Sequence, residues 1–522
     1  MTLLTRYLKY ADAQAHCSSD ALWALFDGNR EYLNIAHECV DRHVEGGRTA
    51  IIVARADNGD ERIDYADLAS DSARFAHLLR ARGVLPGDRV AVMLEPSRAF
   101  YVCLFGAMKL GAIAVPLFTL FGPDALRLRL QDCGAKLLVT HPAKASMLAE
   151  FPGLAVMVLT EFDEDGLSAL LAEFPASYPT TTRADDLAIF QYTSGTTREL
   201  PEAVHHTHRA VVTLMLAALY GSGLRPADRF FCPSSPAWGH GLWHGTLAPL
   251  ALGLTIGAYA GRFDPARLLK ALSEHRFNNI AAAATHYRMI RNSGVIEQYP
   301  LAIDKLSFTG EPLDSETAEF LWQHTGLEPA SMYGTTEVGV VLVNYPGAPD
   351  FEVRRGSLGK PVPGVEVQVR DAAGLECPPG VSGEIMVRRR DRWIPTHDLG
   401  RTDQDGYFYH GGRADDVIIS AGWTMSAVEI EDTLLKHPEV LEAAAIGVPD
   451  ALRGQVVKAY VVCRTSGDEA LAEALREFVR TRLSLHEYPR QFTFVNALPK
   501  TPAGKINRRA LRETAVNSAP SA

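Results

Sequence analysis

Hydrophobic and polar positions alternate between helical and strand-like spacing along most of the chain. Residues 63–83 have apolar positions at helical spacing and end in glycine, which predicts a helix. Residues 88–96 and 136–142 are short apolar runs closed by proline, and each predicts a buried strand. Residues 100–117 predict a helix, a glycine-containing turn and a strand. This alternation predicts an α/β fold in which helices wrap parallel sheets.

The pattern changes from about Gly356 onwards. Residues 364–391 alternate with period two between Pro/Gly turns, which predicts antiparallel strands in a β-rich subdomain. The remaining chain predicts helices near 428–440 and 469–483, with strands at 442–450 and 458–464. We therefore expect a large N-terminal domain over residues 1–411, a hinge at 412–416, and a small mobile α+β domain over 417–522.

Composition and charge narrow the class of protein. A chain of 522 residues is too long for one compact core, so at least two domains are expected. The formal net charge of −10 does not favour nucleic acid or an anionic membrane as a partner. The seven cysteines are scattered and form no C-x-x-C pair, which indicates reduced thiols.

No segment of the sequence predicts membrane insertion or export. The N-terminal 20 residues contain no long apolar run, so a signal peptide is not expected. The most apolar stretch, residues 246–261, is shorter than the roughly 20 residues that a spanning helix needs. We expect a soluble cytoplasmic protein.

A run of small residues follows a predicted strand at 186–192. Residues 193–197 read TSGTT, and their exposed N–H groups and hydroxyls suit phosphate oxygens. The run is not a Walker loop, because no G-x-x-x-x-G-K-[ST] occurs. A Ser/Thr-rich turn without a ligand is the alternative interpretation.

Further motifs downstream favour a nucleotide site. SMYGTTE at 331–337 combines Tyr333, which can stack on a base, with Glu337, which can hold Mg²⁺ through oxygen. An isolated Asp398 can accept from two ribose hydroxyls, and Lys505 lies in PKTPAGK near the C-terminus. Each residue taken alone also has a purely structural interpretation. Glu337 could be an acidic residue at a helix N-terminus, Asp398 could form a surface pair with Arg413, and Lys505 could be one lysine at the start of a basic helix.

In this order the motifs resemble the adenylate-forming superfamily, which includes acyl-CoA synthetases, luciferases and the adenylation domains of peptide synthetases. The resemblance spans nearly the whole chain. Residues 32–43, 449–462 and 488–506 are most similar to the acetyl-CoA and medium-chain acyl-CoA synthetase branch.

The resemblance implies a role for each motif. Residues Thr193, Ser194, Gly195, Thr196 and Thr197 would form the phosphate loop. The adenine would lie against Gly310, Glu311, Pro312, Tyr333 and Gly334. Thr336 would contact the α-phosphate, Glu337 would bind Mg²⁺, and Asp398 with Arg413 would hold the ribose. Lys505 would act in adenylation, Asp415 would be the hinge, and Ala421, Gly422 and Trp423 would face the thiol tunnel.

The implied reaction uses ATP, Mg²⁺ and coenzyme A. A carboxylic acid attacks the α-phosphate of ATP, pyrophosphate leaves, and the thiol of CoA then displaces AMP from the acyl-adenylate. The first step brings several negative charges together, so preorganised cations and N–H groups are needed. Two steps with different geometry favour a swinging domain.

The phosphate loop departs from the family pattern. Arg198-Glu199 and Glu202-Ala203 stand where the family has glycines and a lysine. Thr424 also stands where the acetyl-CoA synthetase branch often has an arginine. We interpret the loop as altered but functional, with Arg198 replacing the missing cation.

The acyl pocket is predicted from the resemblance. The segment PAWGHGLWHG borders this pocket in the family, and Gly334 stands where acetate-using members carry tryptophan. A deeper slot is expected, which favours a C4–C8 aliphatic or benzoate-like acid over acetate. Its predicted walls are Trp238, His240, Thr285, His286 and Gly334. Metal binding by HHTH at 205–208 or by His240 and His244 is a weaker alternative, because no supporting carboxylate or cysteine lies nearby.

Three functions remain open from the sequence. The first is an acyl-CoA synthetase that activates a medium-chain or aromatic carboxylic acid and transfers it to CoA. The second is a stand-alone adenylating enzyme that loads a carrier-protein thiol. The third is a non-catalytic protein that binds nucleotide or acyl-adenylate, suggested by the altered loop and opposed by the intact PKTPAGK segment.

Overall fold

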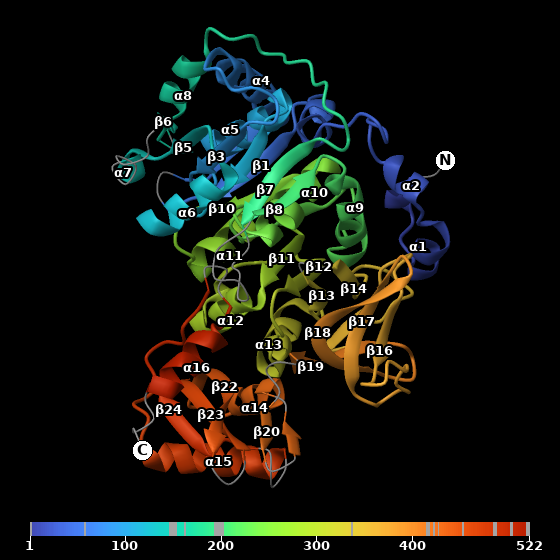
Figure 1. Cartoon of the computed structure of the whole chain (residues 1–522), viewed down its shortest axis with the longest axis vertical. Helices are drawn as coiled ribbons and strands as arrows, with labels where there is room; N and C mark the ends of the chain where they lie inside the picture. The colour runs from blue at the N-terminus through green and yellow to red at the C-terminus, as the bar shows by residue number, and fades with distance from the viewer. Residues whose placement is uncertain are drawn as a thin grey trace. The chain divides into compact units, whose positions relative to one another are not determined.

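The computed structural model describes residues 3–56, 59–145, 154–160, 163–192, 203–335, 338–413, 418–420, 423–425, 427–450, 454–483, 488–501 and 505–517. The chain divides into two compact units. The first comprises Met1–Ala282, Val295–Ser307 and Tyr345–Phe351, and the second comprises Ala283–Gly294, Phe308–Asn344 and Glu352–Ala522. Figure 1 labels the helices and strands of both units.

The first unit contains a six-stranded sheet of order β6-β5-β3-β4-β7-β8. All neighbours are parallel except β7 and β8. The central strands are apolar and buried on both faces, as expected for parallel strands covered by helices. The strands are β3 (Arg89–Met93), β4 (Ile113–Pro116), β5 (Leu137–Thr140), β6 (Ala155–Val158), β7 (Leu187–Tyr192) and β8 (Ala203–Thr207).

Five more strands of the first unit follow the order β11-β9-β10-β1-β2. They pair in parallel except for β1 with β2. The parallel sheets predicted from the sequence are therefore confirmed. These strands are β1 (Thr49–Ala54), β2 (Glu61–Asp64), β9 (Arg229–Phe231), β10 (Thr255–Tyr259) and β11 (Asn279–Ala283).

The predicted helix–turn–strand at 100–117 is present and has identifiable boundaries. Helix α5 (Arg98–Leu110) begins after Ser97, whose Oγ accepts from the Phe100 N–H at 3.2 Å. The helix ends at Gly111, whose φ of 82° favours glycine. It packs on α4 (Tyr65–Ala81) so closely that a Cβ at Gly106 would lie 2.8 Å from the Ser72 carbonyl oxygen.

The other helices of the first unit are mostly short. A π-helical segment, η5 (His240–Leu247), leads into α10 (Ala248–Ala251). The remainder are η1 (Leu4–Arg6), α1 (Tyr10–His16), α2 (Ser19–Trp23), α3 (Ile35–Cys39), η2 (Asp41–His43), α6 (Pro123–Cys133), α7 (Pro142–Ala145), α8 (Glu164–Leu171), α9 (Ala210–Leu216), η4 (Ala217–Gly221), α11 (Pro265–Glu274) and η6 (Ile296–Gln298).

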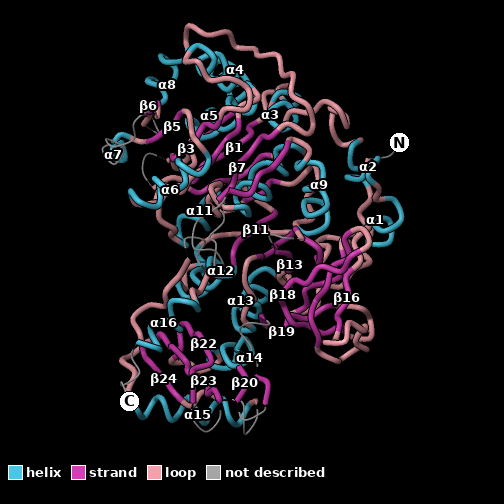
Figure 2. Tube along the Cα trace, in the orientation of Figure 1, coloured by secondary structure: helices cyan, strands magenta, loops and turns pink. Residues whose placement is uncertain are grey.

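Antiparallel strands dominate the first half of the second unit, as the period-two pattern predicted. Strands β13 to β19 run in the order β16-β17-β18-β19-β15-β14-β13, and Figure 2 shows them in magenta. Helices α12 (Ala284–Ser293) and α13 (Ser315–Thr325) accompany them. The strands are β12 (Lys305–Thr309), which begins in the first unit, β13 (Ala330–Thr335), β14 (Gly339–Val343), β15 (Ser357–Pro361), β16 (Val367–Arg370), β17 (Gly383–Arg389), β18 (Arg392–Thr402) and β19 (Phe408–Arg413).

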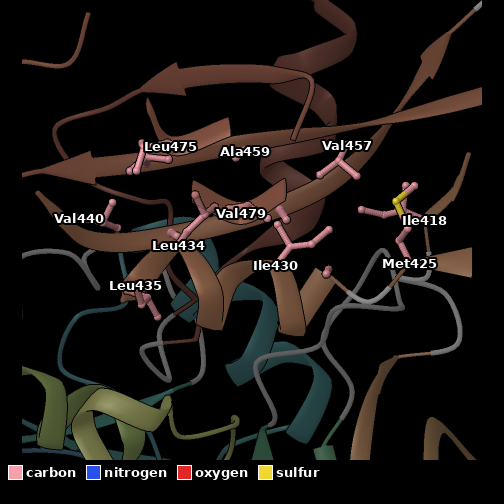
Figure 3. Packing of buried hydrophobic residues seen from close by; sticks show 14 residues of the cluster. Ile418, Met425, Ile430, Leu434, Leu435, Val440, Val457, Ala459, Leu475 and Val479 are labelled. Carbon is pink, nitrogen blue, oxygen red and sulfur yellow. The ribbon is translucent and has the colours of Figure 1, made fainter. Parts of the chain in front are cut away.

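The C-terminal part of the second unit is a five-stranded sheet with helices. Its core packs Ile430 and Leu434 of α14 with Val457 of β23 and with Leu475 and Val479 of α15 (Figure 3). The predicted helices and strands of this region are present, but the helix predicted at 428–440 ends at Leu435 and Val440 begins the next strand. The elements are β20 (Ile418–Ser420), β21 (Trp423–Met425), α14 (Ala427–Leu435), β22 (Val440–Asp450), β23 (Gly454–Cys463), α15 (Glu469–Arg482), β24 (Gln491–Phe494) and α16 (Arg508–Asn517).

Two further expectations concern thiols and membranes. All seven cysteines are free thiols in the structure. Among the described residues, no helix is both long enough and apolar enough to span a bilayer.

Candidate functional site

Tyr333 and Asp398 meet in the second unit. The Tyr333 hydroxyl donates to Asp398 Oδ2 at 2.6 Å, and His410 Nε2 lies 3.7 Å from Asp398 Oδ1. Only 5% of Asp398 is exposed. A buried carboxylate needs a donor such as the Tyr333 hydroxyl, and its burial excludes the alternative of a surface ion pair for Asp398.

The register of β18 and β19 places Asp398 opposite Arg413. Residue 413 ends β19, next to residues 414–417, which lie outside the described part of the chain. The strands therefore bring the backbones of two predicted ribose residues together. The predicted hinge residue Asp415 is among those that the structure does not describe.

The predicted adenine segment begins at Gly310, whose φ of 96° suits glycine. Glu311 follows, and its Oε1 accepts from Thr285 Oγ1 at 2.5 Å and lies 3.3 Å from Arg288 Nη2. Burial alone would lower the pKa of Arg288, but the Glu311 and Asp314 carboxylates raise it overall. Glu311 is thus held by α12 through Thr285, a predicted pocket residue.

Gly334 lies in the hairpin of β13 and β14, beside an irregularity in the register. A Cβ at this position would lie 2.1 Å from the Gly339 carbonyl oxygen and 2.7 Å from the Val340 Cα. Real Cβ atoms do not approach backbone so closely. The missing side chain is therefore required by this hairpin, in addition to any role in a pocket.

The predicted pocket residues Trp238 and His240 lie at the start of η5 in the first unit. Their ring centroids are 5.4 Å apart at 65°, and the Ser234 hydroxyl lies 3.0 Å from His240 Nδ1. His286, on α12 of the second unit, is kept neutral near pH 7, because burial lowers its pKa to about 4. Both segments thus place aromatic or imidazole rings at predicted pocket positions.

Lys505 lies shortly before α16 and pairs with Thr501. Its backbone N–H donates to Thr501 Oγ1 at 3.3 Å, and its carbonyl accepts from the Thr501 N–H at 2.7 Å. A bridge between Lys500 and Ile506 lies next to this pair. The backbone of Lys505 is therefore fixed independently of its side chain.

Several predicted site residues lie outside the described part of the chain. Trp423 is the first residue of β21, and the structure describes its backbone alone. The residues not described are Thr193, Ser194, Gly195, Thr196, Thr197, Arg198, Thr336, Glu337, Asp415, Ala421 and Gly422.

The three histidines of HHTH have separate surroundings. His205 stacks on Phe190 with centroids 3.8 Å apart, and His206 contacts Trp243 at 4.7 Å. His208 is fully buried, and its Nδ1 accepts from the Ile35 N–H at 3.0 Å. Within the described ranges, a group of His, Cys, Asp and Glu close enough to share an ion is formed elsewhere, by Asp60, Glu274 and His275.

A groove of about 420 Å³ lies in the second unit, and none of the residues that line it is a predicted site residue. It is open to solvent and bordered by α12, α13 and α14. Its walls are Arg291, Ser315, Glu316, Glu319, Phe320, Gln323 and Lys436.

Sequence reasoning missed two polar contacts. Arg288, between Glu311 and Asp314, stands in a helix without a motif. Gln191 accepts a hydrogen bond from Trp243 Nε1 at 2.8 Å, and it appeared in the sequence as part of a strand. The tryptophan-rich segment PAWGHGLWHG was the available signal, since a buried indole N–H usually finds an acceptor.

Comparison with known proteins decides the family. The model of the AMP-binding enzyme family matches residues 40–391, and that of the AMP-binding enzyme C-terminal domain matches residues 429–505. The chain belongs to the AMP-binding enzyme family. The predicted hinge at 412–416 falls in the interval between the two matched ranges and stays a prediction.

Relatives of this AMP-binding enzyme are acyl-CoA ligases. Acetyl-coenzyme A synthetase of Bacillus subtilis (strain 168) is 31% identical, over 93% of this chain and 91% of the relative. The 3-hydroxybenzoate–CoA ligase of Aromatoleum sp. (strain CIB) is 30% identical, over 87% of this chain and 92% of the relative. A benzoate CoA ligase structure from Burkholderia xenovorans LB400 matches with a TM-score of 0.79 and 30% identity, over 92% of this chain and all of that one.

The enzyme class follows from these matches. This AMP-binding enzyme is an AMP-forming acid–thiol ligase that uses ATP, Mg²⁺ and coenzyme A.

Proposed function

We propose that this ligase converts a medium-chain or aromatic carboxylic acid to its CoA thioester through an acyl-adenylate. Relatives named for benzoate and 3-hydroxybenzoate support an aromatic acid. The glycine at 334 supports an acid larger than acetate through the resemblance, because acetate-using members carry a tryptophan there.

The contact between Tyr333 and Asp398 carries the proposal. A buried carboxylate fixed by a phenol hydroxyl provides a preorganised acceptor for two ribose hydroxyls. The Tyr333 ring adds a flat apolar face for a base. We assign adenosine binding to this pair, with Gly310, Glu311, Pro312 and Gly334 beside the adenine and Arg413 beside the ribose.

The remaining roles complete the proposed site. Thr193 to Thr197 and Thr336 would bind phosphate oxygens, and Arg198 would supply the pyrophosphate cation. Trp238, His240, Thr285 and His286 would line the acid. The roles of Glu337 as the Mg²⁺ ligand and of Asp415 as the hinge rest on the sequence.

The chemistry requires charge neutralisation. A carboxylate oxygen of the acid attacks the α-phosphorus of ATP, the bond to pyrophosphate breaks, and the CoA thiolate later displaces AMP from the acyl carbon. Bound Mg²⁺ offsets negative charge on the phosphates. Lys505 would donate hydrogen bonds to the carboxylate and α-phosphate during the first step.

A change in the orientation of the C-terminal domain would separate adenylation from thioester formation. We propose that residues 417–522 move about 412–416 relative to residues 1–411, so that Lys505 leaves and the segment of Ala421, Gly422 and Trp423 guides the thiol. Such hinge motion allows one site to serve two geometries.

Pyrophosphate release measured across a panel of acids, with and without CoA, tests the proposal. We expect C4–C8 aliphatic or benzoate-like acids to exceed acetate in kcat/KM and CoA to yield AMP and thioester. Pyrophosphate release without thioester would indicate a carrier-protein thiol as acceptor. Absence of release with every acid would indicate a protein that only binds.

A further inference from the structure

Gln191 ends in a buried carboxamide whose orientation is fixed. It lies on β7, two residues before the predicted phosphate loop, and 5% of the residue is exposed. Trp243 Nε1 donates to its Oε1 at 2.8 Å. An indole N–H is only a donor, so the amide atom facing it is the oxygen. The Nε2 group therefore points away from Trp243.

This Nε2 group carries two N–H donors, and none of the described residues accepts a hydrogen bond from it. The atom is buried. Leaving a buried donor unpaired costs free energy comparable to a lost hydrogen bond, so native structures rarely retain one. The arrangement therefore suits a partner supplied by a bound molecule.

Gly239 lies beside the carboxamide and contributes no side chain there. A Cβ at Gly239 would lie 3.6 Å from Gln191 Oε1 and 3.8 Å from Nε2. Gly239 stands between Trp238 and His240 and retains intermediate exposure. A partly exposed residue without a side chain thus adjoins the amide in the segment where the acid is proposed to bind.

The neighbouring histidines make this space electrically neutral. Burial lowers the pKa values of His206 and His244 to about 4, so neither is charged near pH 7. His206 packs on Trp243 with centroids 4.7 Å apart. A second carboxylate would need a cation to offset its burial, whereas a neutral oxygen needs only a donor.

We propose that Gln191 is a specificity-determining residue whose Nε2 donates to a neutral hydroxyl, ether or keto oxygen on the body of the bound acid, apart from its reacting carboxylate. The inference rests on the proposed function and narrows its substrate class to oxygen-substituted acids. Trp243 is the positioning residue, because it orients the carboxamide.

Paired acids test the inference in the wild-type enzyme. Hydroxy-, methoxy- and keto-substituted benzoic and C4–C8 acids are compared with methyl or methylene isosteres by pyrophosphate release. The best oxygenated acid should exceed its isostere in kcat/KM by about 10- to 100-fold, the range for one buried hydrogen bond.

Two variants test the role of the amide. Gln191→Met keeps the side-chain length but has no donor, so the ratio of kcat/KM between paired acids should fall to near one. Combining it with Trp243→Phe removes both hydrogen-bonding partners, so that no indole N–H is left buried without an acceptor. The ratio should be near one there too.

Gly239→Ala tests whether the acid binds beside the Gln191 carboxamide, and it removes no polar group. The helical φ of −53° and ψ of −42° at Gly239 accept alanine, and the new methyl makes ordinary contacts with Gln191. The midpoint of thermal unfolding should therefore stay unchanged. The methyl should cover the carboxamide and lower the ratio of kcat/KM between the oxygenated acid and its isostere.

Either of two results would overturn the inference. Isosteres used as well as oxygenated acids across the panel would show that Gln191 meets a water molecule. An equal fall in kcat/KM for both acids of each pair in Gln191→Met would show that Gln191 contacts the carboxylate that the two acids share. Failure of the proposed function differs, because acetate would then be used better than every larger acid, or no acid would release pyrophosphate.

Discussion

The Tyr333 hydroxyl and the Asp398 carboxylate, 65 residues apart in sequence, are joined by a hydrogen bond of 2.6 Å. The phenol fixes one oxygen of a carboxylate that strand β18 holds in a buried position. Tyr333 thus provides a ring for the proposed contact with the base, and Asp398 provides an acceptor for the proposed contact with the ribose.

Tyr333→Phe keeps the ring and removes the donor. Hydrogen bonds to charged groups contribute about 1.5–3 kcal/mol, so we expect the KM for ATP to rise by roughly tenfold or more, with a smaller change in kcat. Initial rates at varied ATP measure this. Tyr409→Phe is the matched control, because Tyr409 donates to Asp403 at 3.1 Å outside the proposed site. Equal effects in both variants would argue against adenosine binding at Tyr333.

Lys505→Ala should slow acyl-adenylate formation by at least ~10²-fold, the scale for losing one transition-state donor. It should still convert supplied acyl-adenylate and CoA to thioester, because the backbone of Lys505 is held by contacts to Thr501. Lys500→Ala is the control, since Lys500 pairs with Glu442 at 2.9 Å. Near-normal ATP-dependent turnover in Lys505→Ala would refute the assignment.

Gly334→Ala should destabilise the fold. Its methyl would meet the backbone of β14 at 2.1 Å, and overpacking of this kind costs about 1–3 kcal/mol. Urea unfolding measures the loss. Gly122→Ala is the control, because no atom lies within 4 Å of the added Cβ there. Unaltered stability in Gly334→Ala would mean that the hairpin shifts freely.

Stability should fall as the pH drops from about 6.5 towards 4, and His208 should contribute. Burial lowers its folded-state pKa to about 4, although Asp186 raises it slightly. Between this value and the unfolded value near 6.5, the unfolded chain binds the extra proton, which weakens the native state by up to about 1.4 kcal/mol per pH unit.

His208→Asn tests this contribution. An amide oxygen can replace Nδ1 as the acceptor for the Ile35 N–H but does not titrate. The slope of unfolding free energy against pH should become smaller in this range. The exposed His205, changed in the same way, is the control. An unchanged slope in His208→Asn would assign the acid sensitivity to other groups.

Local signals in the sequence predicted the elements well. The apolar run predicted at 88–96 and the glycine-containing turn predicted within 100–117 depend on neighbouring residues alone, so β3, α5 and β4 follow from spacing. The period-two pattern likewise predicted the pairing of β16 with β17.

Contacts between distant segments were not predictable in this way. The hydrogen bond of Tyr333 with Asp398 depends on the register of separate strands, and that of Gln191 with Trp243 depends on how η5 packs on β7. Gly334 was interpreted through a pocket alone, because its clash with Gly339 appears only once the hairpin is built.

The close approach at Gly334 also bears on how such an enzyme could change its acid in evolution. A single substitution of Gly334 by a larger residue would lower the stability of the fold, and this loss would oppose any gain in selectivity for the acid. Compensating changes in β14 would have to come first or together with it. Substitutions at 334 and in β14 are therefore expected to change together among related enzymes.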